Sequence, residues 1–441
     1  MGKIGFVSIS HEDYLEPAVF EAIKQAEQVV RSSGHQVVAV QEPAVCHRTA
    51  QNAGKKLASS GLDGVVLFLA SWIECPTMMT VIREVEHLPL CVWGFPMFDD
   101  GVQKNSTGSY VAFSMFKGTL DRIGQFYVPI LAAVDSAEAK NTIDLFCCAA
   151  VCRSRLRHCR MLLVGYTSMG IYPGTFDHVF MRVKIGPEIE QRDAYSLIRL
   201  AEESTKEEQD SVIELYRKHA VIRSDVSEES LRKSAGLYIA MRRLALDNQY
   251  EAINVKCQYE FSKEYKMTPC VPLSLLAETG VVASCEGDIL NTVSMYILHC
   301  LTDQVIGYGD AMHHQGDVVL FSSCGFIPFS LGKQGEQVIG NFMPHPGFTG
   351  IQNSFVMRPG RVTLMRLVED RCDYHIIYFT GEGLPTMLRQ GYMPALEVRL
   401  DGDVGDLVSQ YAGQHYAICY GDASEKIEML ARFLHIKAIR I

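Results

Sequence analysis

The sequence predicts an α/β fold in which two doubly wound parallel sheets are followed by an antiparallel, barrel-like β domain. Strand-like and helix-like segments alternate with short loops over residues 1–159, and a second series of the same kind covers residues 160–302. From residue 303, short strand-like runs are separated by turn signals such as Gly316-Asp317. We therefore expect three domains, at residues 1–159, 160–302 and 303–441.

The first domain begins with a β-rich segment, Lys3–Ile9, and continues with apolar residues at helical spacing over Pro17–Ser32. Residues 64–70 are almost continuously apolar, as strands buried on both faces of a parallel sheet are. The further strands are expected at residues 37–40, 88–95 and 126–134, and the further helices at 49–60, 78–87 and 136–159.

The second domain repeats the alternation, and the third ends in a helical pattern. In the second domain, strands are expected at residues 160–166, 188–192, 250–257 and 281–285, and helices at 206–220, 228–248 and 270–279. In the third, Leu407, Tyr411, His415 and Ile418 recur at helical spacing, which predicts that residues 404–420 belong to a pair of closing helices that carries His415.

Composition and charge exclude several classes of protein. Lys and Arg number 41 against 51 Asp and Glu, and the net charge of −10 argues against a nucleic-acid partner. The apolar stretches are too short to span a bilayer, so no membrane is expected. The 14 cysteines are scattered and the start lacks a signal-peptide pattern, which predicts reduced thiols and a cytoplasmic protein. The dinucleotide fingerprint GxGxxG is missing, which disfavours a dinucleotide-dependent oxidoreductase.

Acidic residues follow two of the strands expected in the second domain. Glu260 lies just past the strand at 250–257, and Glu286 and Asp288 lie just past the strand at 281–285. If these strands are parallel neighbours, the carboxylates lie beyond the carboxyl ends of the sheet, where such folds bind ligands and where oxygen ligands suit a hard cation. Alternatively, Glu260 is a solvated loop residue and Asp288 a helix N-cap. Glu286 either supports the site or faces solvent.

Two histidines are candidates for the same site. His345 lies in the rigid segment Pro344-His345-Pro346 and is either a ligand or a loop contact. His415 is a histidine on the apolar side of the helix expected at its position, where a buried structural role competes with a role as a metal ligand.

Several short blocks together resemble the L-fucose isomerase/L-arabinose isomerase superfamily, most strongly from residue 250 to the end. The blocks stand in the same order and spacing as in that superfamily, and they are Lys256 to Glu260, Cys285-Glu286-Gly287-Asp288, Ser323-Cys324-Gly325, Pro359 to Leu364, Gly381-Glu382, and His415 with Gly421-Asp422. The resemblance implies two Rossmann-like domains, a C-terminal β-barrel domain and a metal-dependent aldose–ketose isomerase.

The resemblance also implies a set of site residues. The metal ligands of the superfamily fall on Glu260, Asp288 and His415, and the implied cofactor is Mn²⁺ or another divalent cation such as Mg²⁺ or Co²⁺. Glu260 and Asp288 are then the catalytic candidates, one as the base that moves a proton between C1 and C2 through a cis-enediolate, and one assisting between the oxygens. The residue types leave their roles interchangeable.

The substrate contacts depart from the superfamily pattern. Related sequences read His-Cys-Gly-Asn where this chain has Ser323-Cys324-Gly325-Phe326, so Ser323 and Phe326 become the candidate sugar contacts. A deoxyhexose, a pentose and a hexose modified at C6, including an anionic one, all stay open. The alternative function is a non-enzymatic sugar-binding or sensing protein with two Rossmann-like domains.

A long loop at residues 96–109 suggests a contribution from a neighbouring subunit. The loop is rich in Asp, Asn and Ser, and such loops are more often functional than idle, although a flexible surface loop is the alternative. The resemblance implies a trimer or hexamer. We therefore expect a homo-oligomer in which Asn105 or Ser106 of one subunit contacts the sugar bound by another.

Overall fold

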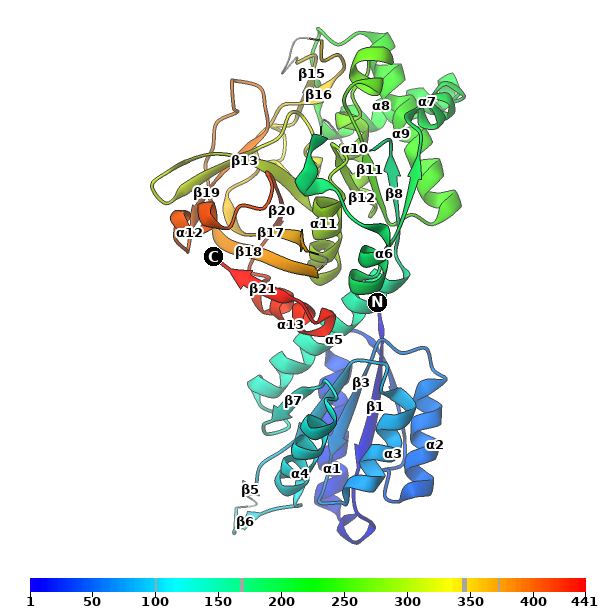
Figure 1. Ribbon diagram of the computed structural model, residues 1–441, viewed down its shortest axis with the longest axis vertical. Coiled ribbons are helices and arrows are strands. Elements are labelled where there is room, and N and C mark those ends of the chain that lie inside the picture. The colour runs from blue at the N-terminus through cyan, green and yellow to red at the C-terminus, as the bar shows by residue number, and fades with distance from the viewer. Residues whose placement is uncertain (100, 167–169, 343–346, 372) are drawn as a thin grey trace. The chain divides into compact units, whose positions relative to one another are not determined.

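The computed structural model describes residues 1–441 except 100, 167–169, 343–346 and 372. The chain forms two compact units, Met1–Ser154 and Arg155–Ile441, and the boundary falls near the end of a long helix, α5 (Ala137–His158). Figure 1 labels many of the elements of both units. In the described part of the chain, every helix is too short or too polar to cross a membrane. The finer division at residue 303 stays a prediction.

The first unit contains the expected parallel sheet. Its five strands are ordered β2-β1-β3-β4-β7, and all neighbouring pairs run parallel. The strands are β1 (Lys3–Ile9), β2 (Gln36–Ala39), β3 (Gly64–Leu69), β4 (Leu90–Gly94) and β7 (Val128–Leu131). The helices between them are α1 (Pro17–Ser32), α2 (His47–Ala58), α3 (Cys75–Val85) and α4 (Ser109–Ile123), and a two-stranded hairpin is formed by β5 (Phe98–Asp99) and β6 (Lys104–Asn105).

Helices cover both faces of this sheet. Apolar residues of α2, α3 and α4 form one continuous core with strands β1, β3 and β4. On the other face, a side chain at Gly64 would meet Phe146 and Ala150 of α5. All residues of β3 are therefore buried, which explains the apolar run read from the sequence.

The second unit opens with another parallel sheet. Its four strands are ordered β12-β11-β8-β9 and are parallel throughout. They are β8 (Arg160–Val164), β9 (Glu188–Arg192), β11 (Ala252–Val255) and β12 (Val282–Cys285). The helices are α6 (His178–Phe180), α7 (Ala194–Glu202), α8 (Lys206–His219), α9 (Glu228–Asn248), α10 (Cys270–Ala277) and α11 (Ile289–Thr302), and a small sheet joins β10 (Val221–Ile222), β15 (Val338–Gly340) and β16 (Gln352–Asn353).

A closed six-stranded antiparallel barrel follows, as the sequence predicts. The ring runs β17-β20-β13-β14-β19-β18 and closes through the pairing of β17 with β18, while β21 (Lys437–Arg440) adds in parallel to β18. Helix α11 packs against both the parallel sheet and strands β17 and β20, so most of its residues are buried. The barrel strands are β13 (Gly307–Gln315), β14 (Val318–Ser322), β17 (Gly360–Asp370), β18 (Asp373–Leu384), β19 (Ala395–Leu400) and β20 (His415–Tyr420).

The expectation that residues 404–420 are helical and carry His415 on a closing helix is wrong for His415–Tyr420. The structure has a short helix, α12 (Val404–Ser409), and then strand β20 (His415–Tyr420), which is followed by helix α13 (Ser424–Leu434). Strand β20 lies between β13 and β17, and five of its six residues are buried. The helical spacing of apolar residues was therefore a coincidence, because a strand buried on both faces is apolar at every position.

Candidate functional site

The strands that precede the predicted carboxylates are neighbours in the second sheet. Strand β11 pairs in parallel with β12, with Val255 opposite Cys285. Glu260 follows the first strand, and Glu286 and Asp288 follow the second, so all three come after the carboxyl ends of adjacent strands. This confirms the condition on which the sequence-based site depended.

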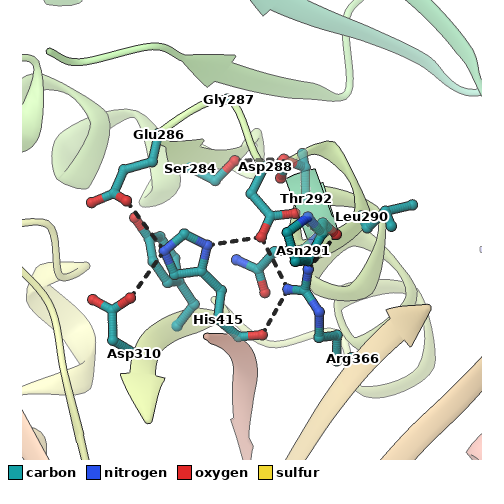
Figure 2. Close-up of polar contacts among 12 residues, drawn as sticks. Ser284, Glu286, Gly287, Asp288, Leu290, Asn291, Thr292, Asp310, Arg366 and His415 are labelled. Atoms are coloured by element: carbon teal, nitrogen blue, oxygen red, sulfur yellow. Dashed lines mark hydrogen bonds and ion pairs between the residues drawn. The ribbon is translucent and has the colours of Figure 1, made fainter. Parts of the chain in front are cut away.

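Asp288 lies at the centre of a buried polar cluster (Figure 2). It is fully buried and caps helix α11, where its Oδ1 accepts a hydrogen bond from the backbone N–H of Asn291 at 2.9 Å. Its Oδ2 lies 2.8 Å from Nδ1 of His415 and 3.0 Å from Nη1 of Arg366. Asp288 is therefore an N-cap, as the structural alternative predicted, and it also contacts the predicted histidine.

His415 begins strand β20 and has carboxylates on both sides of its ring (Figure 2). Asp288 contacts Nδ1, while Nε2 faces Asp310 Oδ1 at 3.2 Å and Glu286 Oε2 at 3.4 Å. The ring is fully buried, and Nε2 makes no hydrogen bond of good geometry to the described residues. The arrangement surrounds one imidazole with three acidic groups.

The sequence does not identify Asp310 as a site residue, and it leaves open whether Glu286 supports the site or faces solvent. Asp310 lies on β13, directly opposite His415 in the register of the antiparallel pair, and no local sequence pattern marks it. Glu286 has a φ of 68°, a left-handed conformation that is uncommon for a non-glycine residue. Its side chain is 9% exposed and points at His415, so the solvent-facing alternative is wrong.

The charges in this cluster shift one another's pKa. Burial alone raises the pKa of Asp288, but the Arg366 guanidinium and the hydrogen bond with His415 outweigh it and lower that pKa to about 2. Burial lowers the pKa of His415, yet the hydrogen bond with Asp288 and the nearby carboxylates of Asp310 and Glu286 raise it well above the usual value. Both shifts favour the ionised forms of the two residues in this arrangement.

Glu260 pairs with Lys256, four residues earlier in the chain, and is not part of the polar cluster around His415. Lys256 Nζ donates a hydrogen bond to its Oε1 at 2.8 Å and lies 2.7 Å from its Oε2. The lysine side chain is fully buried, and its ammonium group lies 3.6 Å from the ring centre of Tyr166 and 5.1 Å from that of Tyr259. The structure therefore brings Asp288 and His415 together and pairs Glu260 with a lysine.

In the part of the chain that the structure describes, no three histidine, cysteine, aspartate or glutamate side chains are grouped as they would be around a metal ion. The carboxylates contact opposite ring nitrogens of His415, so they surround the ring and do not converge on one point. The predicted metal triad stays a prediction. The other candidate histidine, His345, lies outside the described residues.

The predicted sugar contacts in the second unit lie next to this cluster. Ser323 Oγ donates a hydrogen bond to the backbone carbonyl of Phe326 at 2.5 Å, and both residues are buried. The Phe326 ring stacks on Tyr308 with centroids 5.4 Å apart, and Tyr308 meets the His415 ring edge-on at 4.9 Å. Phe326 thus belongs to an aromatic wall behind His415, and a direct sugar contact stays a prediction.

Asn105 and Ser106, the predicted sugar contacts in the first unit, form hydrogen bonds with residues close to them in the chain. Asn105 is in β6, opposite Phe98, and its Oδ1 accepts a hydrogen bond from Gln103 Nε2 at 3.2 Å. Ser106 Oγ accepts one from the backbone N–H of Gly108 at 3.0 Å, and Ser106 also lines an open pocket between the hairpin and α4. Their proposed role at a neighbour's site stays a prediction.

Comparison with known proteins gives related isomerases. The chain is 24% identical over 286 residues to the sulfoquinovose isomerase of Alkalicoccus urumqiensis, 27% over 225 residues to that of Priestia aryabhattai, and 23% over 378 residues to that of Clostridium sp. (strain MSTE9). These similarities support the resemblance to the fucose isomerase and arabinose isomerase superfamily that the sequence blocks indicate.

The extent of these matches differs. They cover 63%, 49% and 83% of this chain and 64%, 50% and 80% of the respective relatives. No protein-family profile matches the chain. Among solved structures, a periplasmic sugar-binding protein from Legionella pneumophila is 10% identical over 69% of this chain and 97% of its own, with a TM-score of 0.20, too low to support any inference.

Proposed function

We propose that this protein is a metal-dependent aldose–ketose isomerase that acts on a monosaccharide. The observation that carries the proposal is the buried pair of Asp288 and His415, which lies beyond the end of strand β12 in a chain related to named sugar isomerases. Open α/β sheets bind ligands at that edge, and the pair joins an oxygen and a nitrogen donor.

The charge of the cluster supports a divalent cation. Asp288, Glu286 and Asp310 carry three negative charges around His415, and Arg366 supplies one positive charge. The cluster favours a protonated His415 when no ion is bound, so an ion that binds the imidazole would displace that proton. Two negative charges would then remain, and one divalent cation would balance them. Nε2 of His415 makes no hydrogen bond in the described residues and faces Glu286 and Asp310, and a ring nitrogen of this kind is a common metal ligand.

We propose Glu260, Asp288 and His415 as the residues that hold this ion, which would be Mn²⁺, Mg²⁺ or Co²⁺. Two carboxylates and an imidazole are a common donor set for these metals. A bound divalent cation supplies a Lewis acid that polarises the adjacent carbonyl and hydroxyl oxygens of the sugar.

The two carboxylates proposed at the site, Asp288 and Glu260, are not equally suited to transfer a proton. Asp288 is a weak base, because its pKa is about 2 and both of its oxygens are engaged. Glu260 is the better candidate to take the proton from C2 and return it to C1 of the cis-enediolate, since its side chain is 37% exposed. Lys256 holds the Glu260 carboxylate in place.

A hexose with an anionic group at C6 is the substrate class that we favour. The relatives named above are sulfoquinovose isomerases. A deoxyhexose and a pentose are the competing classes, and the same assay separates them.

The test is ketose formation from a panel of aldoses, including sulfoquinovose, with and without Mn²⁺, Mg²⁺ or Co²⁺. We expect activity that depends on the metal and is lost in Glu260→Gln and Asp288→Asn, with the fold retained. Glu264→Gln, an exposed carboxylate in the same turn, is the matched control and should be active. No ketose from any sugar with any of these ions would refute the function, and an active Glu260→Gln would refute only the base.

We also propose a homo-oligomer, a trimer or hexamer, in which Asn105 or Ser106 of one subunit reaches the sugar of another. Exposed apolar side chains lie in their loop and at the start of α4, among them Met97 and Tyr110, and would be covered in such an assembly. Light scattering of the active protein at low micromolar concentration tests this. A fully active monomer would show that one chain completes the site.

A further inference from the structure

Arg366 is a fully buried arginine that links three distant segments of the second unit. It lies on β17, and its guanidinium reaches Asp288 at the start of α11 (Figure 2). Nη1 donates hydrogen bonds to Asp288 Oδ2 at 3.0 Å and to the backbone carbonyl of His415 at 2.9 Å. Nη2 donates to the backbone carbonyl of Pro173 at 2.7 Å.

These bonds fix the two residues that the proposed function places at the metal. Asp288 Oδ1 is held by the backbone of α11, so the Arg366 contact to Oδ2 fixes the second oxygen and with it the plane of the carboxylate. The same nitrogen holds the backbone of His415 where β20 begins. One guanidinium therefore sets the position of the helix cap relative to the strand.

Two glycines leave room for this arrangement. Gly413 has a φ of 156°, and a β-carbon there would lie 2.5 Å from Cζ, Nε and Nη2 of Arg366. A β-carbon at Gly174 would lie 2.9 Å from Cα and Cγ of Asp288. Any side chain at either position would displace the arginine or the aspartate, so the close packing on both sides matches a fixed guanidinium.

The geometry of arginine suits this role and that of lysine does not. A planar guanidinium directs several N–H groups along fixed lines, whereas an ammonium is a single point donor on a flexible stem. A charge is costly to bury, and here its partners are one carboxylate and two backbone carbonyls from different elements.

We propose that Arg366 is a positioning residue of the isomerase site, which holds Asp288 and His415 at the separation that metal binding requires. This inference rests on the proposed function. Arg366 acts through Asp288 and His415 and touches neither the sugar nor the reacting atoms. Residues that orient metal ligands in this way often matter nearly as much as the ligands.

The test compares Arg366→Met, Arg366→Lys and Gly413→Ala in the full chain, with Mn²⁺ binding measured by electron paramagnetic resonance and kcat and KM measured separately. For Arg366→Met we expect Mn²⁺ affinity and kcat to fall by about 10- to 100-fold, with the sugar KM at saturating Mn²⁺ nearly unchanged. Arg366→Lys should recover part of the loss because it restores the charge. Gly413→Ala should weaken Mn²⁺ binding with the arginine still present.

Arg361→Gln is the matched control, because Arg361 lies on the same strand and pairs with Asp401 at the surface. It should bind Mn²⁺ and turn over as the wild type does. If Arg366→Met is folded and keeps wild-type Mn²⁺ affinity and kcat, the inference is wrong. If Arg366→Met fails to fold, Arg366→Lys and Gly413→Ala decide, and unchanged Mn²⁺ affinity in both overturns it.

The two proposals fail in different ways. A wild-type chain that neither binds Mn²⁺ nor isomerises any sugar overturns the proposed function. If the wild type is active and depends on Mn²⁺, but the Arg366 variants bind Mn²⁺ and turn over as the wild type does, only the positioning role of Arg366 is overturned.

Discussion

Strand β17 carries two arginines whose ion pairs lie in opposite environments. Arg361 forms a two-pronged pair with Asp401, and the side chains are 37% and 42% exposed. Arg366 pairs with Asp288, and both side chains are 0% exposed. The two pairs use the same chemical groups, so the comparison separates the effect of burial from the effect of charge.

The two pairs contribute differently to stability because one is exposed and the other is buried. An exposed pair gains little because water screens it, and such pairs contribute about 0–1 kcal/mol. A buried pair gains little net stability over apolar residues, but removal of one partner leaves an uncompensated charge and costs about 3–5 kcal/mol. The buried pair at Asp288 is therefore better explained by the geometry it fixes than by stability.

Replacement of Arg366 by methionine should give the largest effect. We expect the free energy of unfolding of the second unit to fall by about 3–5 kcal/mol, because Asp288 would lose its buried counter-charge. Urea denaturation followed by circular dichroism measures this. Trp72 and Trp93 are the only tryptophans and both lie in the first unit, so their fluorescence is an internal control for that unit.

A double variant sharpens this first prediction. In an Asp288→Asn background, Arg366→Met should lower the free energy of unfolding by less than it does alone. The buried aspartate charge that would otherwise lose its partner is absent in that background. Equal costs in both backgrounds would mean that the pair does not act as a unit.

Acid should weaken the buried pair next. The pKa of Asp288 is about 2 in the folded protein and about 3.9 when unfolded, so its stabilisation is complete above about pH 4 and is lost as the pH falls toward 2. Between pH 5 and pH 3 we expect the stability gap between wild type and Asp288→Asn to shrink by about 1 kcal/mol. Urea midpoints across this range measure the gap, and a constant gap would contradict the low pKa.

Replacement of Arg361 by glutamine should give the smallest effect. We expect a loss of about 0.5 kcal/mol or less, because both partners are solvated. The loss should shrink further in about 0.5 M salt, which screens exposed charges and leaves buried ones largely unaffected. If Arg361→Gln lowers the free energy of unfolding as much as Arg366→Met does in the same urea assay, burial does not set the contribution of the two ion pairs.

Parts of the site could be predicted from local sequence. Strand–helix alternation correctly predicts that the acidic residues follow the carboxyl ends of two neighbouring parallel strands, β11 and β12. Asp288 as an N-cap follows from the same local pattern. His415 was assigned to a helix, because its apolar neighbours also fit a helical spacing, and the structure puts it on a strand.

The two parallel sheets, the barrel and the carboxylates after the strands can be predicted from the sequence, because they depend on periodicity and on residues close in the chain. The groups that meet His415 are set by tertiary contacts. Asp310 faces it through the register of β13 with β20, and Arg366 reaches it from β17 through packing of the barrel against α11. Such contacts join residues far apart in the chain, and no local pattern encodes the register that brings them together.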